Sequence, residues 1–516
     1  MNRNIKNNIR LSVLALFAIV TLTACSDDDV APQPVGPTNG LEHINAADAG
    51  LYTSFYKPEI GYVGDPMPFY NEADQTFYLF YLQDWRDGRK NDHPIYYTTT
   101  RDYASFTPIQ AAIQCGPNIA HQDLFIGTGS CVEHNGTYYF FYTGHNDYLT
   151  PKEKLMLATS PDLKTWTKQT DFEMVAPAEC DQNNFRDPHV YYDPYRYCYV
   201  MLVTTIKNGR GCIARYTSSD LRTWTEIASF TEFESDAEIL ECPDIFQMGD
   251  KWYLIFSRIN RDPQRKTFYR VANSPEGPWQ IARDENGVAH ETFDGLFLYA
   301  GKTASDGVNR YISGWCSTAE RVHEGNELQW AGALISHKIV SDPVTGCLST
   351  MIPGALDKKF GTSVALKSLL LSENVTANSN TYTVGQGGKA VFARNKASFR
   401  LTMTIDASHA EKFGLAFGAS GEQENVNKIL FNLADNHRGC TGLFMYNGAD
   451  ELNFTPLDVP ANRKFNVTVI AEKSICTIYV NDQVAFTNRI LKMNENPWMI
   501  FSDNGNALFS DIRVYE

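Results

Sequence analysis

Three acidic residues that stand one or two positions before a proline, far apart in the chain, are the best candidates for chemistry. The motifs are Gly64-Asp65-Pro66, Arg186-Asp187-Pro188 and Glu241-Cys242-Pro243. A proline restricts the residue before it to extended backbone, so Asp65 can be aimed inward and held there. The alternative for any single motif is a tight surface turn, because acidic residues, glycine and proline are all frequent in turns.

Three carboxyl groups brought to one place would suit acid and base catalysis. They repel one another, which raises some of their pKa values above the usual range near 4. One carboxyl group can then stay protonated as an acid while another stays ionised as a nucleophile. Because the motifs are widely separated, this chemistry requires a fold that returns the chain repeatedly to one point.

An internal repeat predicts such a fold. A polar turn with an aromatic residue at or next to its last position recurs at 101–107, 160–167, 218–225 and 274–279. Aromatic strand patterns recur at 77–81, 138–142, 197–203, 252–256 and 310–315. Five strand-rich units of about 60 residues predict a five-bladed β-propeller, with a β-sandwich of accidental internal similarity as the alternative.

The propeller interpretation explains the spacing of the acidic motifs. Asp65 lies just before the strand of the first unit, Asp187 before the third and Glu241 before the fourth. Equivalent strands of all blades converge on one central channel, so the three carboxyl groups can meet there.

The pattern changes after residue 355. Shorter alternating segments at 399–405, 465–470 and 475–480 are separated by Asn and Gly turns, which is typical of an antiparallel β-sandwich. The sequence therefore predicts an all-β protein, with a catalytic propeller at 46–355 and a β-sandwich at 356–516. The sandwich contains no constellation of acidic-proline motifs like that of the propeller, so we expect a structural or sugar-contacting role for it.

The N-terminus has the features of an export signal. Basic residues precede the apolar run 11–22, which is too short to span a membrane, and Leu22-Thr23-Ala24-Cys25 follows. Cys25 resembles the lipidated cysteine of a bacterial lipobox, and the acidic stretch 26–29 resembles the surface-export tag of Bacteroides-type lipoproteins. We expect a signal peptide at 1–25, a flexible tether at 26–45 and an outer-membrane lipoprotein exposed on the cell surface. An ordinary cleaved signal is the alternative.

Composition narrows the choice of partners. The chain has 27 Tyr, 30 Phe and 8 Trp with 35 Gly and 23 Pro, which favours strands and turns over helices. A net charge of −15 argues against nucleic acid, whose phosphates require clustered Lys and Arg, so neutral substrates fit better. The 11 cysteines show no CxxC pairs or Cys/His ligand spacing, and we expect no metal or cofactor.

The ordered motifs resemble glycoside hydrolase family 32, the β-fructosidases that include invertases, levanases and inulinases. The matches are the Asp65-Pro66 block, Phe185-Arg186-Asp187-Pro188, Glu241-Cys242-Pro243, Thr128-Gly129-Ser130 and Trp330-Ala331-Gly332. The C-terminal hairpin at 479–490 is similar too, so the resemblance covers nearly all of the chain after the tether.

This resemblance implies a retaining glycosidase that cleaves β-fructofuranosyl linkages in fructans or fructo-oligosaccharides through a covalent intermediate. It implies that Asp65 is the nucleophile, Glu241 the general acid and base, and Asp187 the stabiliser of the transition state. Further substrate-binding residues are expected from the same resemblance, namely Arg186, Gln83, Trp85, Thr128 and Ser130. For Trp85, a tryptophan packed at the rim is the alternative to one that stacks on a sugar. The pocket departs from the family pattern, because Gly64 stands where a substrate-binding asparagine is usual and Met67 replaces a polar residue.

Two other functions remain open. The neighbouring glycoside hydrolase family 43 shares five blades and three carboxyl groups, but it inverts configuration and acts on arabinose- or xylose-containing glycans. The Glu241-Cys242-Pro243-Asp244 motif and the C-terminal sandwich favour family 32 over it. A non-catalytic surface glycan-binding protein is the other alternative. The presence of all three carboxyl groups argues against it.

Overall fold

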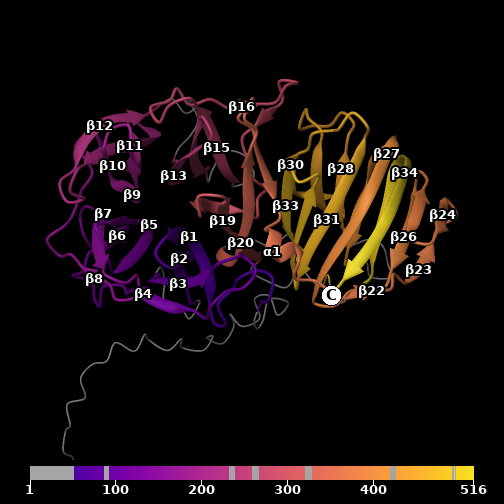
Figure 1. The fold of residues 1–516 in the computed structure, drawn as a ribbon, viewed down its shortest axis with the longest axis horizontal. Helices are drawn as coiled ribbons and strands as arrows, with labels where there is room; N and C mark the ends of the chain where they lie inside the picture. Colours follow the sequence, from indigo (N-terminus) through magenta and orange to yellow (C-terminus); the bar gives the residue numbers. More distant parts are fainter. Residues whose placement is uncertain are drawn as a thin grey trace, which may run out of the picture. The chain divides into compact units, whose positions relative to one another are not determined.

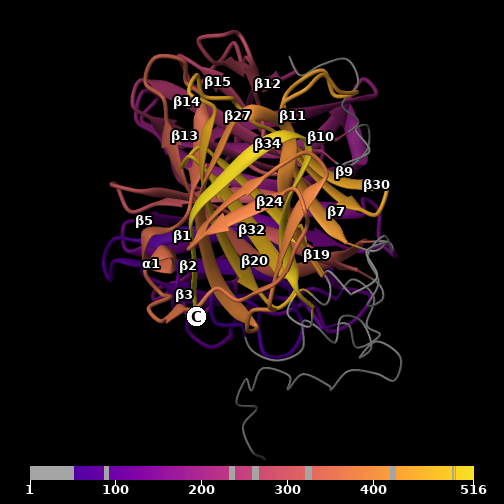
Figure 2. The same ribbon diagram turned by 90° about the vertical axis from the view of Figure 1, so that its right-hand side faces the viewer.

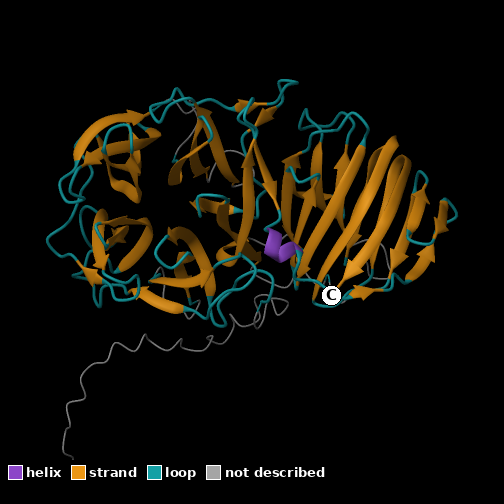
Figure 3. Ribbon diagram, in the orientation of Figure 1, coloured by secondary structure: helices purple, strands orange, loops and turns teal. Residues whose placement is uncertain are grey.

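The computed structural model shows an all-β chain of strands joined by loops, with one short helix among the described residues (Figure 3). It describes residues 52–85, 92–231, 239–258, 266–319, 328–418, 426–490, 493 and 496–516. The predicted signal peptide, tether and lipidated Cys25 lie outside these residues. Within them the one helix is α1 (Gly354–Asp357), and no described helix is long and apolar enough to cross a bilayer.

The N-terminal part of the chain consists of antiparallel sheets arranged around a common centre (Figure 1). One sheet joins the two ends of this part through the pair Val63–Gly332. It holds β1 (Tyr62–Asn71), β2 (Thr76–Asp84), β3 (Ile95–Thr100), β4 (Gln110–Ile113), β18 (Tyr299–Ser305), β19 (Arg310–Ala319), β20 (Leu328–Ser341) and β21 (Leu348–Met351).

The remaining sheets of this part are formed by strands that follow one another along the chain. One contains β5 (Phe125–His134), β6 (Thr137–His145), β7 (Glu153–Ser160) and β8 (Thr167–Lys168). The next contains β9 (Cys180–Asp193), β10 (Cys198–Lys207), β11 (Arg210–Ser218) and β12 (Thr225–Phe230). A three-stranded sheet holds β13 (Glu241–Met248), β14 (Lys251–Arg258) and β15 (Lys266–Ala272), and a small one holds β16 (Ala282–Arg283) and β17 (Ala289–His290).

Aromatic residues hold neighbouring sheets together. In β2 every residue from Thr76 to Gln83 is buried, because this strand is covered on both faces. Phe80 of β2 meets Phe140 of β6 edge to face, with ring centroids 5.0 Å apart. Each fully buried Phe contributes roughly 1.5–3 kcal/mol to folding, which accounts for the aromatic strand patterns seen in the sequence.

The repeated polar turn of the sequence is one recurring structure. In three copies an aspartate Oδ1 accepts hydrogen bonds from the backbone N–H groups two and three residues later, at 2.7–2.9 Å, and the acceptors are Asp102, Asp162 and Asp220. The residue after each aspartate has a positive φ of 56° to 64°. The aspartate side chain therefore holds the turn that leads into the last strand of the sheet.

The C-terminal part is a sandwich of long antiparallel strands, with β27 and β34 side by side along most of their length (Figure 2). Its strands are β22 (Ser363–Val364), β23 (Ser368–Leu371), β24 (Val375–Asn378), β25 (Thr381–Val384), β26 (Gly388–Phe392), β27 (Ser398–Phe417), β28 (Asn427–Asn432), β29 (Gly442–Asn447), β30 (Asp450–Pro456), β31 (Lys464–Glu472), β32 (Ile475–Val480), β33 (Val484–Arg489) and β34 (Trp498–Tyr515). Inward-facing residues such as Leu401, Phe413 and Phe509 form one apolar core.

Buried polar groups join the sandwich to the propeller sheets. His337 of β20 lies 2.9 Å from Asp294 and 3.0 Å from the hydroxyl of Tyr479 in β32. Arg489 of β33 donates to the backbone carbonyl of Cys316 at 3.1 Å. All ten cysteines after Cys25 are free thiols, and six of them are buried, where a thiol packs as a small apolar group.

Candidate active site

Each acidic-proline motif lies at a β-bulge in the first strand of its sheet. In β1 the pairing register shifts between Gly64 and Met67, on either side of Asp65 and Pro66. Proline has no N–H for the ladder, so it is found at such irregular positions. A bulge re-aims the side chain that it carries, and this turns Asp65 toward the centre of the sheets.

A β-bulge also occurs in the first strand of the other sheets that carry these motifs. Register shifts lie opposite Asp187-Pro188 in β9 and around Cys242-Pro243 in β13, with φ of 57° at Asp187 and 52° at Cys242. Further shifts surround Thr128 in β5 and follow Tyr299 in β18. Five strands therefore direct polar side chains toward one place, although only three of them carry an acidic-proline motif.

Both oxygens of the predicted nucleophile Asp65 accept hydrogen bonds. The Thr128 hydroxyl donates to Oδ2 at 2.7 Å, and the indole N–H of Trp315 donates to Oδ1 at 2.8 Å. Burial raises the pKa of Asp65 and the charge of Glu241 adds to this, while the two donors lower it. The carboxylate is thus fixed in orientation, and its ionised form is stabilised by two hydrogen bonds.

Glu241, the predicted acid and base, has a different environment. Arg186 donates to Oε1 at 3.0 Å, and the Tyr299 hydroxyl donates to Oε2 at 2.7 Å. Burial raises the pKa of Glu241, Arg186 lowers it, and the nearby Asp187 raises it again. A carboxyl group with a raised pKa retains its proton closer to neutral pH, as a general acid must.

Asp187 is buried beside these two groups. Its Oδ2 accepts from the backbone N–H of Cys242 at 2.9 Å. Its own N–H donates to the Thr143 hydroxyl at 2.9 Å. Burial raises the pKa of Asp187, while Arg186 and the Cys242 N–H lower it. This aspartate is therefore held by the backbone of the strand that carries Glu241.

Arg186 links two carboxylates. It pairs with Glu241 and lies 3.5 Å from Glu153 of β7. Burial lowers its pKa, but the charges of Glu153 and Glu241 outweigh this and raise it. The guanidinium remains charged and is committed to protein carboxylates on two sides.

These side chains surround one cavity of about 460 Å³. The described residues that line it include Asp65, Thr128, Arg186, Asp187, Glu241, Tyr299, His93 and Trp330. The structure thus brings together the three predicted catalytic residues with Arg186 and Thr128.

Three other predicted substrate-binding residues lie away from this cavity. Gln83 is fully buried and donates to the backbone carbonyl of Ile60 at 3.1 Å. Trp85 is buried against Tyr96, with ring centroids 5.3 Å apart. The Ser130 hydroxyl donates to the carbonyl of Pro188 at 3.0 Å, so it connects two sheets. Each of these side chains satisfies packing or backbone groups, and the expectation that it lines the pocket is not met.

The structure also explains the two departures from the family pattern. A Cβ atom on Gly64 would lie 2.1 Å from Cη2 of Trp330, so the indole occupies the space of a side chain there. Met67 is buried and its sulfur lies 3.0 Å from the N–H of Gly129. The first change therefore reshapes the cavity wall, and the second concerns packing between sheets.

Sequence reasoning missed several residues of the site. Tyr299 has no acidic-proline motif, and its signal was its place before the aromatic strand of the fifth unit. Trp315 belongs to a recognised strand pattern, yet its contact with Asp65 depends on two strands at opposite ends of the N-terminal part. His93 offered no sequence signal.

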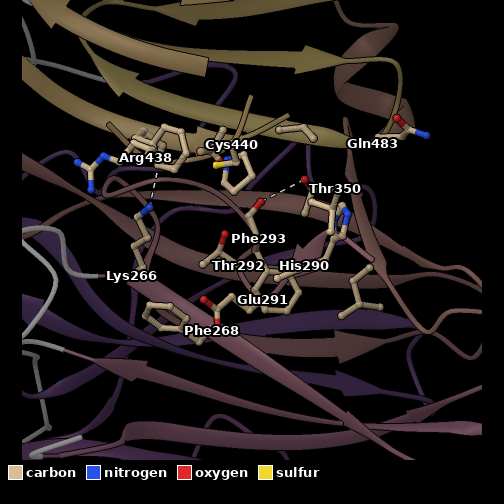
Figure 4. A pocket seen from close by; sticks show the side chains of 17 residues that line it. Lys266, Phe268, His290, Glu291, Thr292, Phe293, Thr350, Arg438, Cys440 and Gln483 are labelled. Atoms are coloured by element: carbon tan, nitrogen blue, oxygen red, sulfur yellow. Dashed lines mark hydrogen bonds between the residues drawn. The ribbon is translucent and has the colours of Figure 1, made fainter. Parts of the chain in front are cut away.

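Possible metal ligands meet elsewhere. Asp284, His290 and Asp458 have ligand atoms within 4.8 Å of one another, and His290 forms an ion pair of 3.2 Å with Asp458. His290 also borders a separate hollow of about 340 Å³ (Figure 4). There Lys266 donates to the carbonyl of Phe454 at 2.9 Å. The predicted catalytic residues do not line that hollow.

Comparisons with known proteins give a family match over most of the chain. Residues 55–341 match the glycosyl hydrolases family 32 N-terminal domain, and residues 346–514 match the GH32, BT1760-like, C-terminal domain. A sucrose-6-phosphate hydrolase of Escherichia coli is 24% identical over 89% of this chain and 93% of its own length. A raffinose invertase of the same species is 23% identical over 92% of this chain and 97% of its own length.

Solved structures share the fold. An exo-inulinase from Aspergillus awamori superposes with a TM-score of 0.68 at 15% identity, over 90% of this chain and 97% of its own. Fructan 1-exohydrolase IIa from Cichorium intybus superposes with a TM-score of 0.69 at 14% identity, over 90% of this chain and 96% of its own. The architecture of a β-propeller followed by a β-sandwich is therefore common to these proteins.

Proposed function

Because this chain belongs to glycosyl hydrolases family 32, we propose that it hydrolyses β-fructofuranosyl linkages in fructans or fructo-oligosaccharides with retention of configuration. The observation that carries the proposal is that Asp65 and Glu241 line one cavity with different hydrogen-bond partners. A retaining glycosidase needs such a pair, one as nucleophile and one as acid and base.

In the first step Asp65 attacks the anomeric carbon of the fructosyl unit. Thr128 and Trp315 hold its two oxygens, so the carboxylate does not have to reorient. Glu241 gives its proton to the leaving oxygen, and the bond between the two sugars breaks. Asp187 stabilises the positive charge that develops on the ring.

In the second step Glu241, now ionised, removes a proton from water. The resulting hydroxide attacks the anomeric carbon and releases fructose, while Asp65 leaves as a carboxylate. Arg186 and Tyr299 donate to the ionised Glu241, which supports its alternation between acid and base.

The cavity favours a neutral sugar over a phosphorylated one. Arg186 is the only lysine or arginine among its described lining residues, and it is paired with Glu241 and Glu153. A phosphate group is best bound by uncommitted Arg or Lys. Fructans and sucrose fit this cavity better than sucrose 6-phosphate, the substrate in the name of several relatives.

A panel of levan, inulin, sucrose, sucrose 6-phosphate and arabinofuranosides tests the proposal. We expect fructose as the first sugar released, with sucrose preferred to its phosphate. Release of arabinose alone would instead support the family 43 activity. Binding of oligosaccharide without release of any sugar would support the glycan-binding function.

We also infer that the propeller has five blades. The first strands are neighbours in a ring, since β1 contacts β5 and β18, β9 contacts β5 and β13, and β13 contacts β18. The eight-stranded sheet then counts as two blades joined by the pair Val63–Gly332. We place the boundary with the sandwich at residues 355 and 356, inside α1.

We further propose that the protein is a lipoprotein exposed on the outer surface of a Bacteroides-type cell. The apolar run 11–22 followed by Cys25 and the acidic stretch 26–29 support this. Labelling with a palmitate analogue should mark the parent protein and leave Cys25→Ala unmarked. Equal labelling of both would contradict the proposal, and protease treatment of whole cells tests surface exposure.

A further inference from the structure

A histidine and a tryptophan from separate strands stack at the cavity beside the predicted nucleophile. His93 precedes β3 and Trp330 lies in β20, and their ring centroids are 4.3 Å apart with planes at 27°. Both rings line the cavity that also contains Asp65 and Glu241.

The tryptophan of this pair is fixed in place. Three atoms of its six-membered ring lie within 2.8 Å of the position that a Cβ on Gly64 would take. Its ring also meets that of Trp315 at 6.1 Å and 61°, and Trp315 donates to Asp65. The indole is therefore held against the backbone next to the nucleophile, and His93 covers it from another side.

The imidazole of His93 has polar atoms available for a ligand. Among the described residues, burial and the charges of Asp84 and Asp92 act on this imidazole, and no hydrogen bond to a ring nitrogen is among these influences. Burial lowers the pKa of His93, against the opposing charges of Asp84 and Asp92. A neutral imidazole provides one donor and one acceptor, which suits a sugar hydroxyl.

We propose that His93 is a substrate-binding residue of this glycosidase, where a ring nitrogen binds a hydroxyl group of a neutral sugar and Trp330 supplies the platform that orients the ring. This rests on the proposed function and deepens it by naming a specificity residue. The surrounding charges agree, because Asp65, Asp84, Asp92 and Glu241 disfavour an anionic group at this wall.

Two substitutions separate hydrogen bonding from stacking. His93→Phe keeps an aromatic ring on Trp330 but removes both polar atoms, and His93→Gln keeps a donor and an acceptor but removes the ring. We expect His93→Phe to raise KM for sucrose and fructo-oligosaccharides about five- to tenfold, the effect of one lost hydrogen bond. kcat should stay within about twofold of the parent value, and His93→Gln should keep KM within about threefold of the parent value.

The control is His437→Phe, a matched change at an exposed histidine of the sandwich. It should leave KM and kcat unchanged. Isothermal titration calorimetry of Glu241→Gln with fructo-oligosaccharide, with and without His93→Phe, measures binding without turnover. If His93→Phe does not fold, Trp330→Leu tests the platform and should raise KM in the same direction.

The inference is overturned if His93→Phe binds and hydrolyses neutral substrates with the parent KM, or if kcat alone falls. It is also overturned if the parent enzyme prefers sucrose 6-phosphate and His93→Phe abolishes that preference. A parent protein that releases no fructose from any fructoside contradicts the proposed function instead, so the two failures are distinguishable.

Discussion

The indole N–H of Trp315 donates a hydrogen bond of 2.8 Å to Oδ1 of Asp65, although 250 positions separate the two residues. Trp315 lies in β19 and Asp65 in β1, which belong to the same sheet through the pair Val63–Gly332. The closure of the N-terminal part on itself thus directly sets the orientation and charge of the predicted nucleophile.

Trp315→Phe should therefore move the acidic limb of the kcat/KM profile to higher pH. The lost donor had lowered the pKa of Asp65, so more of this carboxylate becomes protonated at a given pH. We expect a loss of about tenfold in kcat/KM at the acidic limb, since a hydrogen bond to a charged group contributes about 1.5–3 kcal/mol. Trp224→Phe is the control, because the Trp224 N–H has no hydrogen-bond partner among the described residues. An unchanged acidic limb in Trp315→Phe would contradict this assignment.

Glu241→Gln should lower kcat for sucrose by about 10²- to 10⁴-fold, the range that general acid–base catalysis contributes. An amide cannot donate a proton to the leaving oxygen or take one from water. A nitrophenyl fructoside needs little protonation of its leaving group, so its burst of nitrophenol in stopped-flow should be much less affected. Fructan hydrolysis at the parent rate would show that Glu241 is not the acid.

Arg186→Met should move the alkaline limb of kcat/KM to higher pH. Activity falls on this limb as Glu241 loses its proton, and Arg186 lowers the pKa of that group. Removing the guanidinium raises the pKa, so the protonated form persists to higher pH. Full pH profiles of parent and variant measure the shift, and a shift to lower pH would contradict the electrostatic role of Arg186.

The first fructose released should have the configuration of the substrate. A covalent intermediate on Asp65 inverts the anomeric centre, and attack by water inverts it again. Proton NMR during the first minutes of hydrolysis detects the anomer before mutarotation. An inverted first product would exclude the covalent mechanism and support direct attack by water.

Asp220→Ala should lower the free energy of unfolding by about 1 kcal/mol, because two backbone N–H groups lose their acceptor. The same hydrogen bonds lower the pKa of Asp220 to about 2. Its stabilisation is thus present above the unfolded pKa near 3.9 and is lost as pH falls toward 2. Urea unfolding at pH 7 measures the difference, and Asp220→Asn, which keeps an acceptor oxygen, should lose less. Equal stability of Asp220→Ala and parent would show that this turn does not depend on the side chain.

Much of this protein could be predicted from sequence because local chemistry repeats along it. Neighbouring residues determine each aspartate turn, aromatic strand and acidic-proline motif. The order of these features along the chain therefore predicted an all-β protein. It also predicted that Asp65, Asp187 and Glu241 lie at one site. Proline matters most here, since Pro66, Pro188 and Pro243 lack the N–H of a regular ladder and each lies at a bulge of its strand.

Only the tertiary structure decided which other side chains reach the cavity. Gln83 and Trp85 follow the first motif closely in sequence, yet alternation and packing direct both into the interior. Tyr299 and Trp315 come from distant strands and contact the carboxylates, because the sheets close around a centre. Side-chain direction depends on register, bulges and neighbours from other sheets, and these exist only once the chain has folded.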